Sequence, residues 1–114
     1  MTTTSTIPPA EVLLLDALIT PTGHGIASRI LAKNAGGSLT LFAFDGGQGL
    51  AEHTAPFDAI VIVLDGRLAL TIGGAEVVAT PGTVVRMPAN VPHAVDAPVP
   101  CRMLLVMLRE PTAA

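Results

Sequence analysis

The sequence predicts an all-β fold, a small antiparallel β-barrel or jelly roll. Apolar runs of strand length, rich in Val, Ile and Leu, alternate with glycine or proline turns at roughly even spacing, and no long helical period appears. A chain of 114 residues is expected to form one domain. Residues 1–10, rich in threonine and proline, are expected to be a disordered or loosely attached arm, and residues 11–114 the barrel.

Short β-forming segments follow one another from residue 26 to the C-terminal region. The run Ala59–Leu64 is continuously apolar, which predicts a strand buried on both faces, and Asp65-Gly66 after it is a hairpin signal. The apolar segment Glu11–Ile19, with Asp16 inside it, fits either a short helix or a first strand. The predicted strands are Ile26–Ala32, Ser38–Asp45, Leu50–Ala55, Ala59–Leu64, Arg67–Ile72, Glu76–Thr80, Thr83–Met87, His93–Asp96 and Arg102–Leu108.

Composition excludes several classes of protein. The formal charge is −3 and the six basic residues are scattered singly, so we expect no nucleic-acid partner. The single cysteine, Cys101, allows neither an internal disulfide nor a cysteine-cluster metal site, which suits a cytoplasmic location. No positively charged N-terminal region precedes an apolar run, and no apolar run approaches bilayer length, so we expect neither a signal peptide nor a membrane partner.

The same composition favours self-association. Half of the residues are apolar and 13% are charged, so a chain this small is expected to bury further surface against a copy of itself. The apolar segment Val12–Ile19 is the candidate for joining two copies. We therefore expect a homodimer.

A first motif begins at a glycine turn and ends at the hairpin. Gly47 is followed after five residues by His53, and Ala55 comes two residues later. Three further residues lead to Ala59, and six more lead to Gly66. These spacings resemble the first motif of the cupin superfamily, in which the positions of Ala55 and Ala59 are a histidine and a glutamate.

A second motif follows after a short gap and resembles the second cupin motif. Gly82 and five residues lead to Pro88, Asn90 occupies the glycine position, His93 comes three residues later, and Ala97 occupies the asparagine position. Asparagine is a mild replacement for glycine because it tolerates the left-handed backbone conformation. The resemblance covers nearly the whole chain after Ile26, and it implies a cupin barrel with a pocket.

The resemblance also implies a metal site, because cupins hold a divalent metal with three histidines and a glutamate. This chain keeps His53 and His93 and has alanine at the other two positions. Two imidazoles suit Zn, Ni, Fe, Cu or Mn when another ligand or water completes the coordination shell. Asp58 is the candidate third ligand, provided that a bulge at Pro56 turns it inward.

The pocket is expected to include Gln48 from the preceding turn, with Phe57, Met87 and Met103. We interpret the methionines as core or pocket lining, not as ligands of a soft metal. His24, in a glycine-flanked loop, is expected to be exposed. The remaining candidates are Cys101 as a core residue, and Arg86 and Arg102 as solvated strand residues or anchors for a carboxylate.

Three functions remain open at this point. The protein is an enzyme acting on a small organic molecule through a metal at His53 and His93, a metal-free binding or sensor protein, or an oligomeric scaffold. Two residue types absent from the chain limit the kinds of enzyme that fit the first of these functions. The chain has no tyrosine, which the sugar-epimerase cupins use, and no tryptophan on which a sugar would stack. The alanines at the two ligand positions argue against the usual cupin chemistry.

Overall fold

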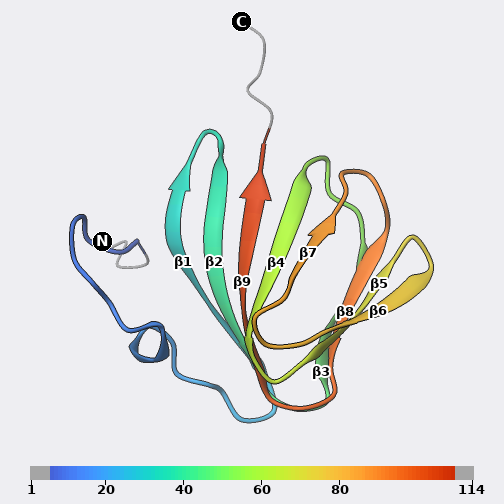
Figure 1. Cartoon of the computed structure of the whole chain (residues 1–114), viewed down its shortest axis with the longest axis horizontal. Coiled ribbons are helices and arrows are strands. Elements are labelled where there is room, and N and C mark those ends of the chain that lie inside the picture. The colour runs from blue at the N-terminus through green and yellow to red at the C-terminus, as the bar shows by residue number, and fades with distance from the viewer. Residues whose placement is uncertain (1–5, 110–114) are drawn as a thin grey trace, which may run out of the picture.

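Two antiparallel sheets make up the part of the chain that the computed structural model describes, residues 6–109 (Figure 1). The five-stranded sheet has the order β1-β2-β9-β4-β7, and the four-stranded sheet has the order β3-β8-β5-β6. A short 3-10 helix, Leu15–Ala17, precedes the strands. The strands are β1 (Ile26–Asn34), β2 (Gly37–Phe44), β3 (Gln48–His53), β4 (Asp58–Asp65), β5 (Leu68–Ile72), β6 (Ala75–Ala79), β7 (Val84–Met87), β8 (His93–Ala97) and β9 (Cys101–Leu108).

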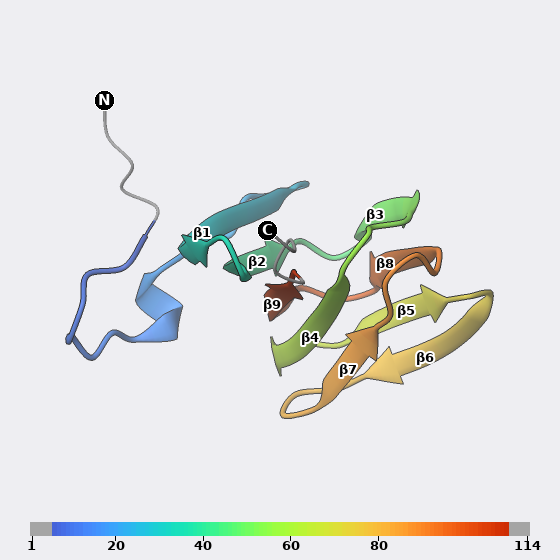
Figure 2. The same ribbon diagram turned by 90° about the horizontal axis from the view of Figure 1, so that it is seen from above.

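The jelly-roll prediction is confirmed, and every predicted strand is present with its ends shifted by no more than two residues. Within the described residues, the two sheets face each other without a backbone ladder joining them into a closed barrel (Figure 2). The segment Glu11–Ile19 forms the 3-10 helix and otherwise irregular backbone.

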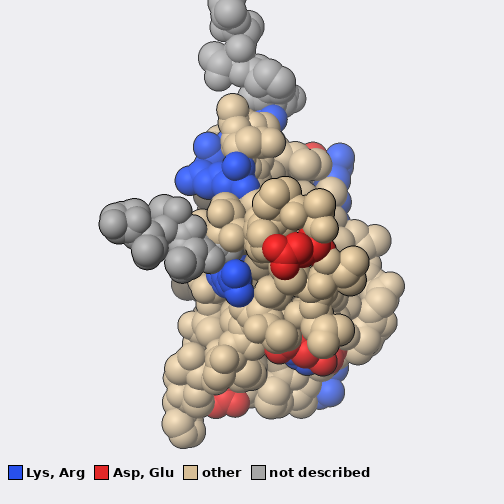
Figure 3. Space-filling view, turned by 90° about the vertical axis from the view of Figure 1, so that its left-hand side faces the viewer, with Lys and Arg blue, Asp and Glu red and all other residues tan. Residues whose placement is uncertain are grey.

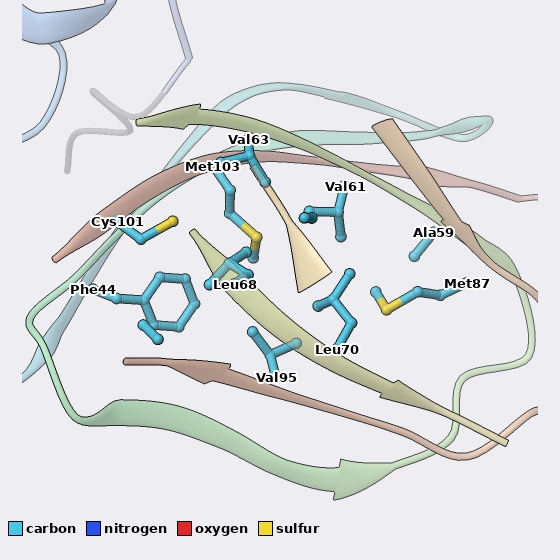
Figure 4. Packing of buried hydrophobic residues seen from close by; sticks show 12 residues of the cluster. Phe44, Ala59, Val61, Val63, Leu68, Leu70, Met87, Val95, Cys101 and Met103 are labelled. Carbon is cyan, nitrogen blue, oxygen red and sulfur yellow. The ribbon is translucent and has the colours of Figure 1, made fainter. Parts of the chain in front are cut away.

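The main hydrophobic core fills the space between the sheets (Figure 4). In β4, Ala59, Val61 and Val63 point into this core and are at most 4% exposed. The alternate side chains of β4, among them Ile60 and Ile62, are only half-buried. The prediction that β4 is buried on both faces is therefore correct for one face only, because little covers the outer face of its sheet.

The N-terminal segment packs against the outer side of the five-stranded sheet, next to β1 and β2. Ile19 belongs to a second apolar cluster with Leu31 and Leu41, and Ile7 packs against this cluster. The Ile7 backbone N–H donates to the Leu31 carbonyl oxygen at 2.8 Å. The expected arm, residues 1–10, is thus anchored at Ile7, while its residues 1–5 lie outside the described part.

Arg102 fastens this segment to the sheet through two carboxylates. Its guanidinium contacts Asp16 in the 3-10 helix at 2.8 Å and Asp65 at the end of β4 at 2.6 Å. The hydrogen bond to Asp65 raises the pKa of Arg102, so the guanidinium of Arg102 remains positively charged. Arg102 therefore has a structural partner already and does not offer its charge to a pocket ligand.

Charged side chains are scattered over the face that carries the N-terminal segment and β1 (Figure 3). They leave large uncharged areas between them, as the low proportion of charged residues predicts. Among residues 6–109, no helix is long and apolar enough to cross a membrane.

Candidate metal and ligand site

The pairing of β3 with β8 places His53 directly opposite His93. Strict alternation along β3 would direct Leu50 and His53 to opposite faces, because they are three residues apart. The register shifts between these two residues, and both side chains line the same cavity. An irregularity of this kind re-aims a side chain, and here it brings His53 to the inner face.

The backbone holds both imidazoles in a defined tautomer. Nδ1 of His53 lies 2.9 Å from the carbonyl oxygen of Ala51, and Nδ1 of His93 lies 3.1 Å from the carbonyl oxygen of Val91. A carbonyl oxygen can only accept a hydrogen bond, so each Nδ1 carries a proton and donates. In the neutral rings, each Nε2 consequently presents a lone pair.

These two lone pairs converge on each other. The Nε2 atoms of His53 and His93 are 3.1 Å apart, and the ring planes are inclined at 69°. Two hydrogen-bond acceptors at this separation do not stabilise each other unless a cation lies with them, either a proton on one nitrogen or a metal ion that accepts both lone pairs. His93 is only 4% exposed, whereas His53 is exposed, so the pair lies where the cavity meets solvent.

The cavity has a volume of about 210 Å³, and the two imidazoles are its only ionisable lining side chains within the described part of the chain. Its polar end is the histidine pair, and the rest of its wall is aliphatic, aromatic and thioether surface. The lining residues are Leu50, His53, Ala55, Phe57, Ala59, Met87, His93, Val95, Met103, Leu105 and Met107.

Three of the four predicted pocket residues, Phe57, Met87 and Met103, line this cavity. Gln48, the fourth, is at the start of β3, opposite Ala97 and away from the lining. Gln48 was expected to reach the pocket from a turn, but it is the first residue of β3 and pairs with Ala97, which does not line the cavity either. Met107 also lines the cavity, in line with the interpretation of the methionines as core or pocket lining. The lining residues that sequence reasoning missed are Leu50, Val95 and Leu105, which look like ordinary strand residues in the sequence.

Asp58 does not join the histidine pair. Its carboxylate accepts a hydrogen bond from the Ala89 backbone N–H at 2.8 Å and contacts the Arg86 guanidinium at 3.4 Å. Since Ala59 faces the cavity, strand alternation directs its neighbour Asp58 away from it, so the inward turn expected at Pro56 does not occur. Within residues 6–109, no three His, Cys, Asp or Glu side chains gather to hold a metal ion.

The remaining candidates have structural surroundings. His24 is exposed in its loop, as expected, and its backbone N–H donates to Asp45 at 2.6 Å. This hydrogen bond lowers the pKa of Asp45. Cys101 is 2% exposed in the core, and burial raises the pKa of its thiol to about 11, so it remains protonated near neutral pH.

Solved structures with the same fold were found in several bacteria. A conserved protein of unknown function from Streptococcus pyogenes is 32% identical with a TM-score of 0.87, and the match covers 94% of each chain. A cupin superfamily protein from Desulfitobacterium hafniense is 25% identical with a TM-score of 0.84, covering 92% of this chain and 96% of that one. KdgF from a Halomonas species, 22% identical over 80% of this chain and 86% of its own with a TM-score of 0.70, shows the fold alone.

A search of curated protein sequences gave no match. The family model described as the cupin domain matches residues 40–107, a span that includes both glycine-bounded motifs, both histidines and all of the cavity lining. This chain is a small member of the cupin family.

Proposed function

We propose that the protein binds a small organic molecule in the cavity, at a metal ion held by His53 and His93. The observation that carries the proposal is the pair of Nε2 lone pairs converging at 3.1 Å, with each Nδ1 facing a backbone carbonyl oxygen. Metal-binding histidines usually donate their second ring nitrogen to a carbonyl or carboxylate in this way. The arrangement supplies both the ligand atoms and the groups that orient them.

The donor set fits a transition-metal ion. Metal–nitrogen bonds in proteins are roughly 2.0–2.1 Å long, so two nitrogens 3.1 Å apart are both within reach of one ion. Two protein ligands leave coordination positions open for water or for a polar group of the bound molecule. A bound metal would supply Lewis acidity at the polar end of the cavity.

The rest of the cavity limits the bound molecule. Its volume of about 210 Å³ is below the roughly 300–1,000 Å³ of most ligand pockets, which favours a compact molecule. Side chains such as Leu50, Phe57 and Leu105 offer apolar contact and no hydrogen bond. We therefore infer a ligand with one polar group directed at the histidines and a short apolar body.

A second candidate function is metal-free binding of the same kind of molecule. It is supported by the alanines at positions 55 and 59, which remove two of the ligands of the usual cupin site. Without a metal, one Nε2–H would donate a hydrogen bond to the other Nε2, and the cavity would receive the apolar body of the molecule beside the paired rings. This function differs from the first in requiring no metal.

Metal titration separates the two functions. We expect the protein, purified without an affinity tag and stripped of metal, to take up one ion from a chromophoric chelator, and His53→Ala or His93→Ala to weaken this uptake about 100-fold. The physical reason is that a single imidazole remains to hold the ion. His24→Asn is the matched control, since it removes an exposed histidine at φ 60°, a conformation that asparagine tolerates.

The metal-centred proposal fails when none of the tested ions, Zn²⁺, Ni²⁺, Fe²⁺, Mn²⁺ and Cu⁺, is retained. It also fails when His24→Asn weakens uptake as much as the two cavity variants. Retention of an apolar probe by the metal-free protein would then support the second candidate.

Self-association through the N-terminal segment remains a proposal. Val12 is fully exposed and Leu14 is 77% exposed, so these apolar side chains have no cover within one copy of residues 6–109. Burying them against a second copy would remove apolar surface from water. We expect light scattering at micromolar concentration to give the mass of a dimer, and Val12→Asp/Leu14→Asp to give a monomer. A monomer from the parent chain would contradict the proposal.

A further inference from the structure

We infer that the metal held by His53 and His93 is copper in the cuprous state, and that the thioether of Met87 or Met107 completes its coordination. The inference rests on the proposed function, because it names the metal of that same site. Three observations carry it: the register of the two methionines, the charge of the cavity and the isolation of the one thiol.

The sheet register places Met87 and Met107 on the cavity wall, on either side of one residue of β4. Ala59 on β4 pairs with Met87 on β7 on one side and with Met107 on β9 on the other. All three residues line the cavity, and Met87 points into the space between the sheets (Figure 4). Ala59 occupies the position of the cupin glutamate, so two methionine residues flank the place where a carboxylate is missing.

The sequence favoured a lining role for Met87, Met103 and Met107, since all three fall on predicted strands and the even spacing puts Met103 and Met107 on one face. The strand register favours a different role. Met87 and Met107 are 20 residues apart in the chain, yet each lies directly across from the same alanine. The cavity therefore collects imidazole nitrogen and thioether sulfur and contains no carboxylate oxygen among its lining residues.

The charge of this donor set favours a monovalent ion. Two neutral imidazoles and thioethers bring no negative charge, and Asp58, the carboxylate next to Ala59 in sequence, is turned to Arg86 and Ala89. A dication held by the pair would lack the carboxylate that compensates it in the usual cupin site, and a charge partly removed from water without compensation is costly. Cu⁺ has half that charge, and thioethers are soft ligands that select it.

Cys101 carries the one thiol of the chain, and this thiol is not available to the site. It does not line the cavity, it is 2% exposed, and its thiol is held in the protonated form. The thiolate is the form that ligates metals. Copper binding that depends on the cavity must therefore use nitrogen and thioether donors.

Competition with a cuprous chelator tests the assignment. The intact protein, reduced and free of oxygen, is titrated with Cu⁺ against bicinchoninate and, separately, with Zn²⁺ against a zinc chelator. We expect Met87→Leu/Met107→Leu to weaken Cu⁺ binding about tenfold or more and to leave Zn²⁺ binding unchanged, since leucine keeps the volume but has no donor atom. Cys101→Ala, which removes the thiol without altering the cavity lining, and His24→Asn, which removes an exposed histidine outside the cavity, are the controls.

X-ray absorption at the copper edge supplies a second measurement that does not depend on affinity. We expect nitrogen and sulfur scatterers around copper in the parent protein and loss of the sulfur scatterer in the double methionine variant. Sulfur that persists in that variant, or Cu⁺ binding that the variant leaves unchanged, overturns the inference while the histidine site stands. Metal binding that is insensitive to His53→Ala and His93→Ala overturns the proposed function as well.

Discussion

Gly66→Ala is expected to lower the free energy of unfolding by about 3–5 kcal/mol, a large share of the stability of a small domain. Gly66 has φ +71°, in the left-handed region that favours glycine. An added Cβ would overlap the backbone oxygen of Pro100 and lie 2.8 Å from Cα of Cys101. The hairpin after β4 would then displace the start of β9, the central strand of its sheet.

Gly47→Ala is the matched control because Gly47 has φ +86° and nothing within 4 Å of an added Cβ. It should cost about 1–2 kcal/mol, the cost of the left-handed conformation alone. Urea unfolding followed by circular dichroism gives both values. Equal losses for the two variants would show that the close approach of Gly66 to the Pro100–Cys101 backbone does not constrain this fold.

Ala55→His/Ala59→Glu is expected to raise the affinity for Mn²⁺ or Zn²⁺ by about 100-fold or more, because it adds an imidazole and a carboxylate to the retained pair. Both alanines already line the cavity beside the histidines. In the metal-free state, the new glutamate would be a buried carboxylate, so the variant should unfold more easily without metal and regain stability when metal is added.

Ala55→His/Ala59→Gln separates the charge from the added volume. It should gain much less affinity for the divalent ions than the glutamate variant, and its stability should depend less on metal. Isothermal titration and thermal unfolding, each with and without metal, measure both effects. A glutamate variant that binds no divalent ion more tightly than the parent would mean that positions 55 and 59 do not face the point shared by the two imidazoles.

The sequence was sufficient to predict the fold because turn residues mark clearly where one strand ends and the next begins. Asp65-Gly66, Gly73-Gly74 and Pro81-Gly82 each separate two strands of the molecule, and Gly66 and Gly82 have the positive φ that the turns require. The resemblance of the two glycine-bounded motifs to those of cupins implied that His53 and His93 share one pocket, and both line the cavity. Local turn chemistry and regular spacing are properties that a single sequence displays.

The site is harder to predict because it depends on side-chain direction and cross-strand register. A shift of one residue in the alternation of β4 decides whether Asp58 or Ala59 faces the cavity. The sequence also does not show where the pairing of β3 becomes irregular. Gln48 is close to the site in sequence but is carried away along its strand. Met107 lies opposite Ala59 only because β4 pairs with β9, and these two strands are far apart in the sequence.

The central proposal is that His53 and His93 share one metal ion through their Nε2 atoms. Anomalous X-ray diffraction from metal-loaded crystals, recorded on both sides of the absorption edge of the metal, tests it most directly. We predict one anomalous peak where the cavity meets solvent, from an ion bonded to both Nε2 atoms. The peak should be absent from crystals of His53→Ala/His93→Ala. A peak bonded to other residues, or none at the pair in crystals of protein that retains stoichiometric metal, would contradict it.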